Sequence, residues 1–573
     1  MNEKFGWIDY FFFLLMLLIS TGMGIYHGIY KKQQTATDYL LGGKQMAIVP
    51  ISMSLISSTL SGLALLSFPA DIYRHGISLL LTSPMHIIVI AIAYYIYIPV
   101  FYDLEVTSIY EYFKIRYNNK IRVFASIMYI IHMILLLPII IYVPALAFSQ
   151  VSDVSVHYLT PLVCSVCIFY TTLGGIKAAV WSDALQFVIM FGSLVLVVFI
   201  GTISSGGVSN VLEKFAAGQR MNISFEMSIT RRDTFWAVAI GSSFAALNHM
   251  GLNQGFVQKC LSLSDFRSIR LTLVLATIGI TIITFLSGFS GLVIFAHYYG
   301  CDPLQMKFIR TYDQLLPMYV VEVANFIPGL PGLFISGIFS ASLSALSASL
   351  NCMAGIIHKD LISGFLPKDT SEIAVSRHLK ILVVTLGVIC TMLVFLVERS
   401  GSLLPLTLSV SAVSGGPLFG LFTAGMLIPT VHTTGALWGG IVSVIVTSVI
   451  IIGGQVHKFR GTFKYVPLPV STDACNTTIT GLFNETTAAI AHSLAGVEKL
   501  EQPFFLFRIS FFYYIMIGGS TAIIVSVIVS HFTERDKPLN KKCLSPIVRS
   551  LVDDGEFTKY HTTEKAIEML SKS

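Results

Sequence analysis

The sequence predicts an all-α polytopic membrane protein with about 13 transmembrane helices, and its composition and apolar runs lead to this class. Of the 573 residues, 54% are hydrophobic and only 12% are charged, whereas soluble domains carry about 25% charged residues. Apolar runs recur at about the 20 residues that a spanning helix needs. The net charge of +6 comes without a basic stripe interleaved with aromatic residues, which argues against nucleic acid as a partner and fits a lipid bilayer.

About thirteen apolar runs are expected to cross the membrane. They lie near residues 7–30, 47–69, 79–102, 123–149, 158–174, 184–206, 233–254, 271–298, 329–354, 377–397, 403–428, 435–453 and 504–530. The first run is long for a signal peptide, has no basic segment before it and is followed at once by Lys31 and Lys32. We therefore expect it to be a retained helix.

Charge and glycosylation motifs predict the same orientation. Short loops after odd-numbered spans are basic, which is typical of cytoplasmic loops; they contain Lys31, Lys32, Lys44, Lys114, Arg116, Lys120, Arg122, Lys259, Arg267 and Arg270. The glycosylation sequons at Asn222, Asn476 and Asn484 fall in the opposite loops. We expect a plasma-membrane protein with its N-terminus outside and its C-terminus in the cytoplasm.

The eight cysteines are scattered and do not form a disulfide framework. Cys301 and Cys475 both fall in loops assigned to the oxidising outer side. Either a disulfide or two free thiols fit the sequence there. Cys164 and Cys167 lie inside an apolar span without a histidine partner, so we interpret them as small packing residues.

Spans two to eleven divide into two sets of five, and an odd repeat length places the sets in opposite orientations in the membrane. The expected segments are 1–46 (an extra helix and a cytoplasmic loop), 47–206 (first repeat), 207–428 (second repeat), 429–530 (two further helices and a glycosylated outer loop) and 531–573 (a cytoplasmic tail). In such folds the first helix of each repeat is unwound at mid-membrane, and the freed backbone groups bind ions and solute.

Polar and small residues cluster at both positions where a broken helix is expected. Span two holds Ser52, Ser54, Ser57, Ser58, Thr59, Ser61 and Gly62, and span seven holds Gly241, Ser242, Ser243, Asn248, His249, Gly251, Asn253 and Gln254. Small residues also let helices pack closely, but two clusters at equivalent positions favour a binding site. In span eleven, Gly415, Gly416 and Pro417 indicate a kink, either a gate or a passive bend.

The charged and titratable residues of the spans are interpreted mainly as structural. We expect Asp183 and Lys177 to form a structural pair on the cytoplasmic side, with part of an inner exit as the alternative. We expect Asp71 and Arg74 to be a solvated loop pair, with attraction of anions at the outer mouth as the alternative. The histidines at 86, 132, 249 and 297 are isolated, and a membrane-core histidine with satisfied hydrogen bonds is the default for all but His249. Only His249, beside the break expected in span seven, is a group that we would test for pH sensitivity.

Three motifs resemble those of the sodium/solute symporter family. They are Thr37-Asp38-Tyr39-Leu40-Leu41-Gly42-Gly43; Ser108-Ile109-Tyr110-Glu111-Tyr112-Phe113 with Arg116-Tyr117; and Tyr170-Thr171-Thr172-Leu173-Gly174-Gly175-Ile176-Lys177-Ala178 with Trp181-Ser182-Asp183 and Gln186. Stretches 68–76, 142–147 and 414–420 resemble the anion-carrying branch, which contains monocarboxylate, iodide and multivitamin symporters. The resemblance covers roughly residues 5–530 and implies a LeuT-like core with a 5+5 inverted repeat.

The resemblance also implies two sites. Sodium would contact the carbonyls of Ser57, Leu60 and Ala341 and the side chain of Ser344, with Ala345 standing where the family usually has a second hydroxyl. One oxygen ligand is therefore missing, and Ser342, Ser347 or a water is the alternative donor. The substrate would contact Thr59, Ala64, Tyr142, Asn253, Thr407 and Leu408. Related anion carriers often have a polar residue in place of Ala64, so the pocket favours a short aliphatic carboxylate.

The expected function is sodium-coupled symport of a small organic anion, first of all a monocarboxylate, by alternating access. Iodide, biotin and pantothenate are alternative substrates. A transporter-like nutrient sensor or receptor with little flux is the alternative class, and Ala345 is its best support. A passive anion channel is the third alternative. Nothing resembles a Walker loop, so ATP is not expected to drive the cycle. We expect no enzymatic activity and no cofactor; sodium is the one metal, and it serves as the coupling ion.

Overall fold

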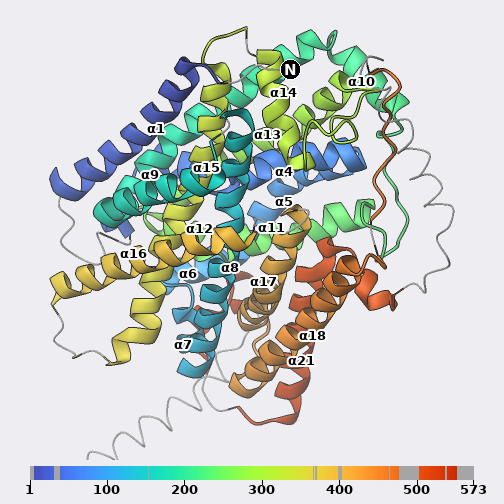
Figure 1. Ribbon diagram of the computed structural model, residues 1–573. Coiled ribbons are helices and arrows are strands. Elements are labelled where there is room, and N and C mark those ends of the chain that lie inside the picture. Colours follow the sequence, from blue (N-terminus) through green and yellow to red (C-terminus); the bar gives the residue numbers. More distant parts are fainter. Residues whose placement is uncertain are drawn as a thin grey trace, which may run out of the picture.

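The chain was analysed as a computed structural model, which describes residues 5–30, 39, 41–152, 154–324, 326–365, 367, 371–397, 403–463, 465–475, 503–535 and 539–550. Within these ranges the structure is helical, and its one β contact is an isolated bridge between Ser224 and Thr234. The prediction of an all-α fold is confirmed (Figure 1).

Ten helical segments of the described part are long and apolar enough to cross a membrane, and one bent pair adds an eleventh. The ten are built on α1 (Trp7–Ile25), α5 (Thr82–Ile92), α8 (Asn119–Ser152), α9 (Val156–Ser204), α13 (Phe266–His297), α15 (Leu330–Ile356), α16 (Glu372–Val397), α17 (Leu403–Leu427), α18 (Thr433–Phe459) and α21 (Tyr514–Phe532). The bent pair is α3 (Ile48–Thr59) and α4 (Gly62–His75), with an angle of 52° between them.

The difference from the expected number of spans lies at two places. α9 covers spans five and six; its 49 residues would reach about 70 Å at about 1.5 Å per residue, more than twice the apolar thickness of about 30 Å. Gly175 interrupts α9 with φ 52° and ψ −149°, a conformation that glycine adopts without a Cβ clash. Span seven is divided into η5 (Trp236–Gly241), α11 (Ser242–Gly251) and α12 (Gln254–Leu261). The total of thirteen stays a prediction.

Both helices that were expected to be broken are broken. The helical dihedral angles end at Leu60, which has φ −99° and ψ 81°, and resume after Ser61. In the second repeat, α11 ends at Gly251, and α12 begins after Asn253, which has φ −87° and ψ 131°. By contrast, α17 continues through Gly415, Gly416 and Pro417 as one helix, and the kink expected in span eleven stays a prediction. Glycines at this place also let α17 pack closely on α21.

α15 lies at the centre of the fold. In its apolar window 83% of the residues are buried, against 28% in α16, which therefore lies at the periphery. α15 packs against α9, α8, α3 and α1. α17, α18 and α21 pack on one another and form the lower right part of Figure 1. The two broken helices thus lie among elements from both repeats.

The second family motif folds into the short helix α7 (Glu111–Arg116), and its residues have packing roles. The guanidinium of Arg116 donates to the carbonyl oxygens of Gly425 at 3.0 Å and Val431 at 2.8 Å. The hydroxyl of Tyr112 donates to the carbonyl of Cys543 at 3.3 Å. This motif therefore joins α7 to the end of α17 and to the segment after α21. It also contacts the second broken helix, because the backbone N–H of Ile109 donates to Oε1 of Gln254 on α12 at 2.7 Å.

Candidate functional site

The break between α3 and α4 lies directly against α15 and α8. A Cβ added to Gly62 would lie 2.5 Å from the Oγ of Ser342 and 2.6 Å from the carbonyl oxygen of Ile338, both on α15. It would also lie 3.0 Å from the Cγ of Pro144 on α8. Gly62 is needed here for this close approach, which brings the freed backbone of the break next to the helix that carries the other predicted sodium ligands.

The five residues predicted to bind sodium are all buried. Ser57, Ala341 and Ser344 are fully inaccessible, and Leu60 and Ala345 are each 7% exposed. The hydroxyls of Ser57 and Ser344 have no hydrogen-bond partner among the described residues. Since a buried polar group without a partner costs about 1–3 kcal/mol, these two oxygens are suited to a bound cation.

The two serines considered as substitutes for the missing hydroxyl at Ala345 are engaged elsewhere. The Oγ of Ser342 donates to the carbonyl of Ile140 on α8 at 3.0 Å. The Oγ of Ser347 donates to the carbonyl of Ser344 at 3.1 Å. Both hydroxyl protons are thus used, and only the oxygen lone pairs remain for a cation.

A buried lysine links the two broken helices to each other and to α9. The ammonium of Lys259 on α12 lies 3.0 Å from Oδ2 of Asp183 on α9, and the side chains of both residues are at most 3% exposed. Lys259 also donates to the carbonyl of Ser54 at 3.2 Å and to the Oγ of Ser58 at 3.0 Å, both on α3. The Oγ of Ser54 donates to the same carboxylate at 2.5 Å.

This ion pair corrects the expectation that Asp183 pairs with Lys177. The sequence placed Lys259 in a cytoplasmic loop, but α12 resumes after the second break and carries Lys259 into the protein. Its partners on α3 and α9 are more than 70 residues away in sequence, so no local pattern indicated the pair.

Asn253 has a defined structural role at the second break. Its Oδ1 accepts hydrogen bonds from the backbone N–H groups of Gly255 at 2.9 Å and Phe256 at 3.4 Å, and so caps α12. An N-cap of this kind stabilises a helix by about 1 kcal/mol. The carbonyl side of the Asn253 amide is therefore used to begin α12, and its amide nitrogen is the part that remains to contact a substrate.

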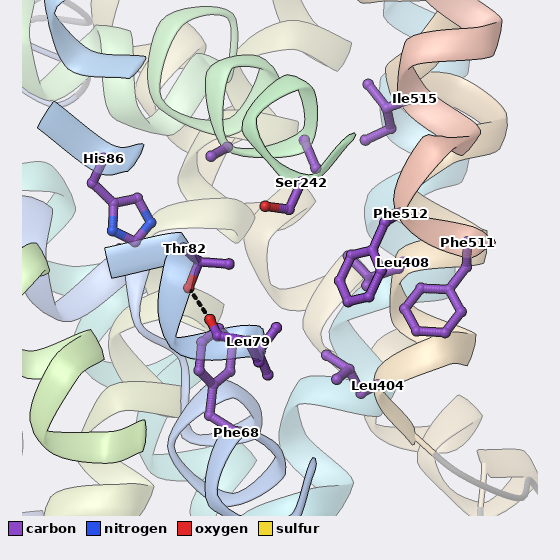
Figure 2. A pocket seen from close by; sticks show the side chains of 12 residues that line it. Phe68, Leu79, Thr82, His86, Ser242, Leu404, Leu408, Phe511, Phe512 and Ile515 are labelled. Carbon is purple, nitrogen blue, oxygen red and sulfur yellow. Dashed lines mark hydrogen bonds between the residues drawn. The ribbon is translucent and has the colours of Figure 1, made fainter. Parts of the chain in front are cut away.

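A cavity of about 140 Å³ lies between α4, α5, α11, α17 and the start of α21 (Figure 2). Its walls are mostly apolar and include Phe68, Leu79, Leu404, Leu408 and Phe512. The polar side chains at its edge come from Thr82, His86 and Ser242. The cavity thus adjoins the helices that follow and precede the two breaks.

Of the six residues predicted to contact substrate, Leu408 lines this cavity. Ala64 lies four residues before Phe68 and Thr407 three residues after Leu404, so each is on or beside a lining face of its helix. Thr59 donates its hydroxyl to the carbonyl of Leu55 at 2.7 Å, and Tyr142 is buried in α8. The cavity does not include these two or Asn253. The prediction of a single cluster of six residues therefore stays untested.

Three histidines that were expected to be isolated lie near one another. His249 on α11 interacts electrostatically with His86 on α5 and with His132 on α8. The expectation of isolation is wrong for these three, because helix packing brings together residues that are far apart in sequence. His297 lies elsewhere, 3.5 Å from the carboxylate of Glu322.

The expected solvated pair of Asp71 and Arg74 is also wrong. Asp71 lies in α4, is only 8% exposed and pairs with Arg232 and with His75. Arg74 instead lies over the ring of Tyr312, 4.7 Å from its centre. Nearby, burial raises the pKa of Asp313, whose carboxylate accepts a hydrogen bond of 2.7 Å from Ser67.

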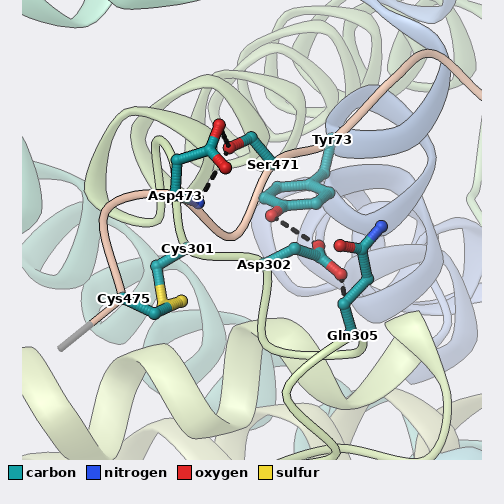
Figure 3. The surroundings of a disulfide bond; sticks show 7 residues. All are labelled: Tyr73, Cys301, Asp302, Gln305, Ser471, Asp473 and Cys475. Carbon is teal, nitrogen blue, oxygen red and sulfur yellow. Dashed lines mark hydrogen bonds between the residues drawn. A yellow bond between two sulfur atoms is a disulfide. The ribbon is translucent and has the colours of Figure 1, made fainter. Parts of the chain in front are cut away.

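Cys301 and Cys475 are joined in a disulfide, with a distance of 5.0 Å between their Cα atoms (Figure 3). Beside it, the hydroxyl of Tyr73 donates to Asp302 at 2.8 Å. A second cavity of about 480 Å³ lies next to this region, between Tyr73, Arg220 and the segment from 469 to 474. Asn222 is exposed, whereas Asn476 and Asn484 lie outside the described residues.

The model of the family "Sodium:solute symporter family" matches residues 39–443. The chain belongs to this family. Sodium-coupled monocarboxylate transporter 2 of Bos taurus is 35% identical to it over 539 residues, which cover 93% of this chain and 85% of that protein. Sodium-coupled monocarboxylate transporter 1 of Mus musculus is 34% identical over 529 residues, 91% of this chain and 86% of that protein.

The fold agrees with this membership. A Na⁺-coupled sialic acid symporter, solved in a substrate-bound outward-open state, superposes with a TM-score of 0.76. The match covers 94% of this chain and 100% of that one, at 23% sequence identity. The prediction of a multi-span symporter fold with a LeuT-like core is confirmed.

Proposed function

We propose that this protein is a sodium-coupled symporter that carries a short monocarboxylate across the plasma membrane by alternating access. The observation that carries the proposal is the broken helix α3–α4 against α15, with two buried serine hydroxyls that lack partners. Free carbonyls and unpartnered hydroxyls are oxygen ligands without a formal charge. They suit a monovalent cation that must be released in every cycle.

The cavity supports a small apolar anion as the solute. Its volume of about 140 Å³ is close to the roughly 150 Å³ of an engineered apolar cavity that binds benzene. Lactate and butyrate are similar in size to benzene. Biotin and pantothenate are much larger than benzene and would require the cavity to expand. The apolar walls favour a carboxylate with an aliphatic tail over iodide. The relatives named for monocarboxylate transport support the same choice.

For the orientation, we propose that the N-terminus is outside and the C-terminus is in the cytoplasm. The basic loops and the three sequons support this arrangement. The disulfide near the ends of α13 and α18 is consistent with an oxidising outer side. Glycosylation at Asn222, Asn476 and Asn484 is part of the same proposal.

The test is uptake of labelled butyrate or lactate into cells that express the protein, first in sodium and then with choline in its place. We expect saturable accumulation that requires sodium. Ser344→Ala should raise the sodium concentration for half-maximal uptake about tenfold. This is the change expected when one contact to a charged group is lost and that contact is as strong as a hydrogen bond. Ser336→Ala is the matched control, since Ser336 is also buried in α15 but donates to the carbonyl of Gly332.

Two results would contradict the proposal. Accumulation that is equal in sodium and choline would place the coupling on another ion. Binding of butyrate without flux would favour a transporter-like sensor, for which the alanine at 345 is the supporting observation.

A further inference from the structure

Four polar side chains follow one face of α15, the most buried of the ten spanning segments of the described part. They are Ser340, Ser344, Ser347 and Asn351, at steps of four, three and four residues. Residues three or four apart share a helix face, so the four side chains form a row along the helix. In the proposed orientation, this row runs from the middle of α15 toward η7 (Ile357–Ile362) on the cytoplasmic side.

Three members of the row are buried without a hydrogen-bond partner. Asn351 is 3% exposed, and neither Oδ1 nor Nδ2 of its amide makes a hydrogen bond with the described residues. The hydroxyls of Ser340 and Ser344 are likewise buried and unpartnered. Ser347 donates to the carbonyl of Ser344 at 3.1 Å, which leaves its oxygen lone pairs free. Most buried polar groups in native proteins are paired, so this row points to a ligand that comes and goes.

Two contacts define the direction in which the row faces. On one side of it, the carbonyl of Leu343 accepts a hydrogen bond of 3.2 Å from the hydroxyl of Tyr170 on α9. On the other side, Sγ of Cys352 lies 3.4 Å from Oε1 of Gln258 on α12. At 3.6 residues per turn, the row falls between these two contacts. α3 packs against α9, α12 and α15 alike, so the row faces the helices that Lys259 holds together.

The chemistry of the row suits a monovalent cation. Its unpartnered atoms include two hydroxyl oxygens and the amide oxygen of Asn351, and hydroxyl and amide oxygens are ligands of hard cations. None of the four side chains carries a formal charge, so a bound cation is not held tightly. The apolar cavity of about 140 Å³ does not include the row, which separates this path from the proposed place of the solute.

We propose that Asn351 is a cytoplasmic-side ligand of the transported sodium ion, which its amide oxygen receives from Ser344 by way of Ser347. This inference rests on the proposed function and adds the route by which the ion leaves. Ser344 and Asn351 are seven residues apart, about 10 Å along the helix, so one ion cannot contact both at once. The two positions are therefore occupied in succession, and Asn351 is the last ligand of the row before the cytoplasm.

The experiment measures the sodium requirement at each face of the membrane separately. Uptake of labelled butyrate is followed over a sodium series in right-side-out and in inside-out plasma-membrane vesicles that contain the full-length protein. The variants are Asn351→Leu, which removes the amide at nearly constant volume, and Asn351→Asp, which adds a charge. Cys352→Ala is the matched control, since Cys352 is equally buried on α15 but faces α12. The rise in melting temperature that sodium produces over choline in purified protein is a readout without flux.

We expect Asn351→Leu to raise the sodium concentration for half-maximal uptake about fivefold at the cytoplasmic face, the effect of one lost contact to a charge. The value at the outer face should change less than twofold. Asn351→Asp should lower the cytoplasmic value, because a carboxylate attracts a cation more strongly than an amide does. A general packing defect would act on both faces alike, and the ratio between faces does not depend on the amount of protein. If Asn351→Leu does not fold, Asn351→Ala takes its place.

The outcomes separate this inference from the proposed function. If wild-type uptake requires sodium and Asn351→Leu keeps the ratio between faces of Cys352→Ala, the role of Asn351 is overturned and the transport function stands. Equal rises at both faces would also overturn it. If wild-type uptake is equal in sodium and choline, the proposed function fails. A sodium-induced melting shift that shrinks in Asn351→Leu and grows in Asn351→Asp would then still support a cation ligand. Without uptake in sodium and without a melting shift, both are overturned.

Discussion

At the break between α3 and α4, the groups around the gap are oxygens: freed carbonyls and the hydroxyls of Ser57 and Ser344. At the break between α11 and α12, the polar side chains are the imidazole of His249, in the last turn of α11, and the amide of Asn253, which caps α12. The two breaks occupy equivalent positions in the two repeats. The two broken helices thus have the same backbone arrangement but different side chains beside the gap. In the proposed function, the first break binds the cation.

The two breaks are also connected. Lys259 lies on α12, the helix after the second break. Its ammonium donates to Ser54 and Ser58 on α3, the helix before the first break, and it pairs with Asp183. A change of position at either break therefore has to move or break these contacts. Substitutions at each break show how far the two breaks differ and how strongly this link joins them.

The largest effect is expected from Lys259→Met. It leaves the carboxylate of Asp183 buried without its cation, and removal of one partner of a buried pair costs about 3–5 kcal/mol. We expect a much lower melting temperature of the purified protein and little protein at the surface. Lys259→Arg keeps the charge and should retain most of the stability. Equal stability of Lys259→Met and the wild type would show that the link between the breaks is weak.

Gly62→Ala should affect the first break alone. The added methyl would meet the Oγ of Ser342 at 2.5 Å and the carbonyl of Ile338 at 2.6 Å, and overpacking of this kind costs about 1–3 kcal/mol. We expect a lower melting temperature together with weaker apparent affinity for sodium. Gly192→Ala in α9 is the control, because a Cβ there meets nothing within 4 Å. A Gly62→Ala protein as stable as this control would contradict the close approach at the break.

Ala345→Ser would increase the difference between the two breaks, because it adds a hydroxyl oxygen beside the first one. If its hydroxyl reaches the cation, the sodium concentration for half-maximal uptake should fall about tenfold. The KM for butyrate at saturating sodium should change little, since the added oxygen is on the cation side. Uptake measured over a sodium series gives both values. An unchanged sodium requirement would mean that a water or another serine already supplies the missing ligand.

The smallest effect is expected from Asn253→Ala at the second break. Loss of the cap on α12 should lower the free energy of unfolding by about 1 kcal/mol. Asn253→Ser keeps a capping oxygen and should restore most of that stability in a thermal melt. If Asn253→Ser is stable but has a raised KM for butyrate, the amide nitrogen contacts the solute as well. If both variants match the wild type in stability, the cap has no measurable role.

The breaks themselves could be predicted from the sequence, because their cause is local. The hydroxyl cluster around Ser57 and the polar residues around Asn253 are unfavourable in lipid. Such residues inside an apolar span can be recognised from the sequence alone, even when the helices that they contact are unknown. The predicted sodium ligands required more than a local pattern. Leu60 and Ala341 are proposed to contribute backbone oxygens, which leave no signal in residue type, so the resemblance to a family supplied them.

The residues that were missed are those whose role depends on distant partners. Lys259 looks like an ordinary basic residue after a span, and only the continuation of α12 into the protein brings it to Asp183. Asp71 is separated by 161 positions from its partner Arg232, and the two meet only through the packing of the folded chain. Patterns along the chain record which face of a helix is apolar, but not which other helix that face meets.

The disulfide between Cys301 and Cys475 has a covalent consequence. With a sequence separation of 174, it closes a ring of chain that contains α14 (Leu315–Ala324), α15, α16, α17 and α18. A protease that cuts once within this ring leaves the two fragments bonded to each other. Such nicked protein would migrate as one species on a gel run without reductant and as two fragments once the disulfide is reduced.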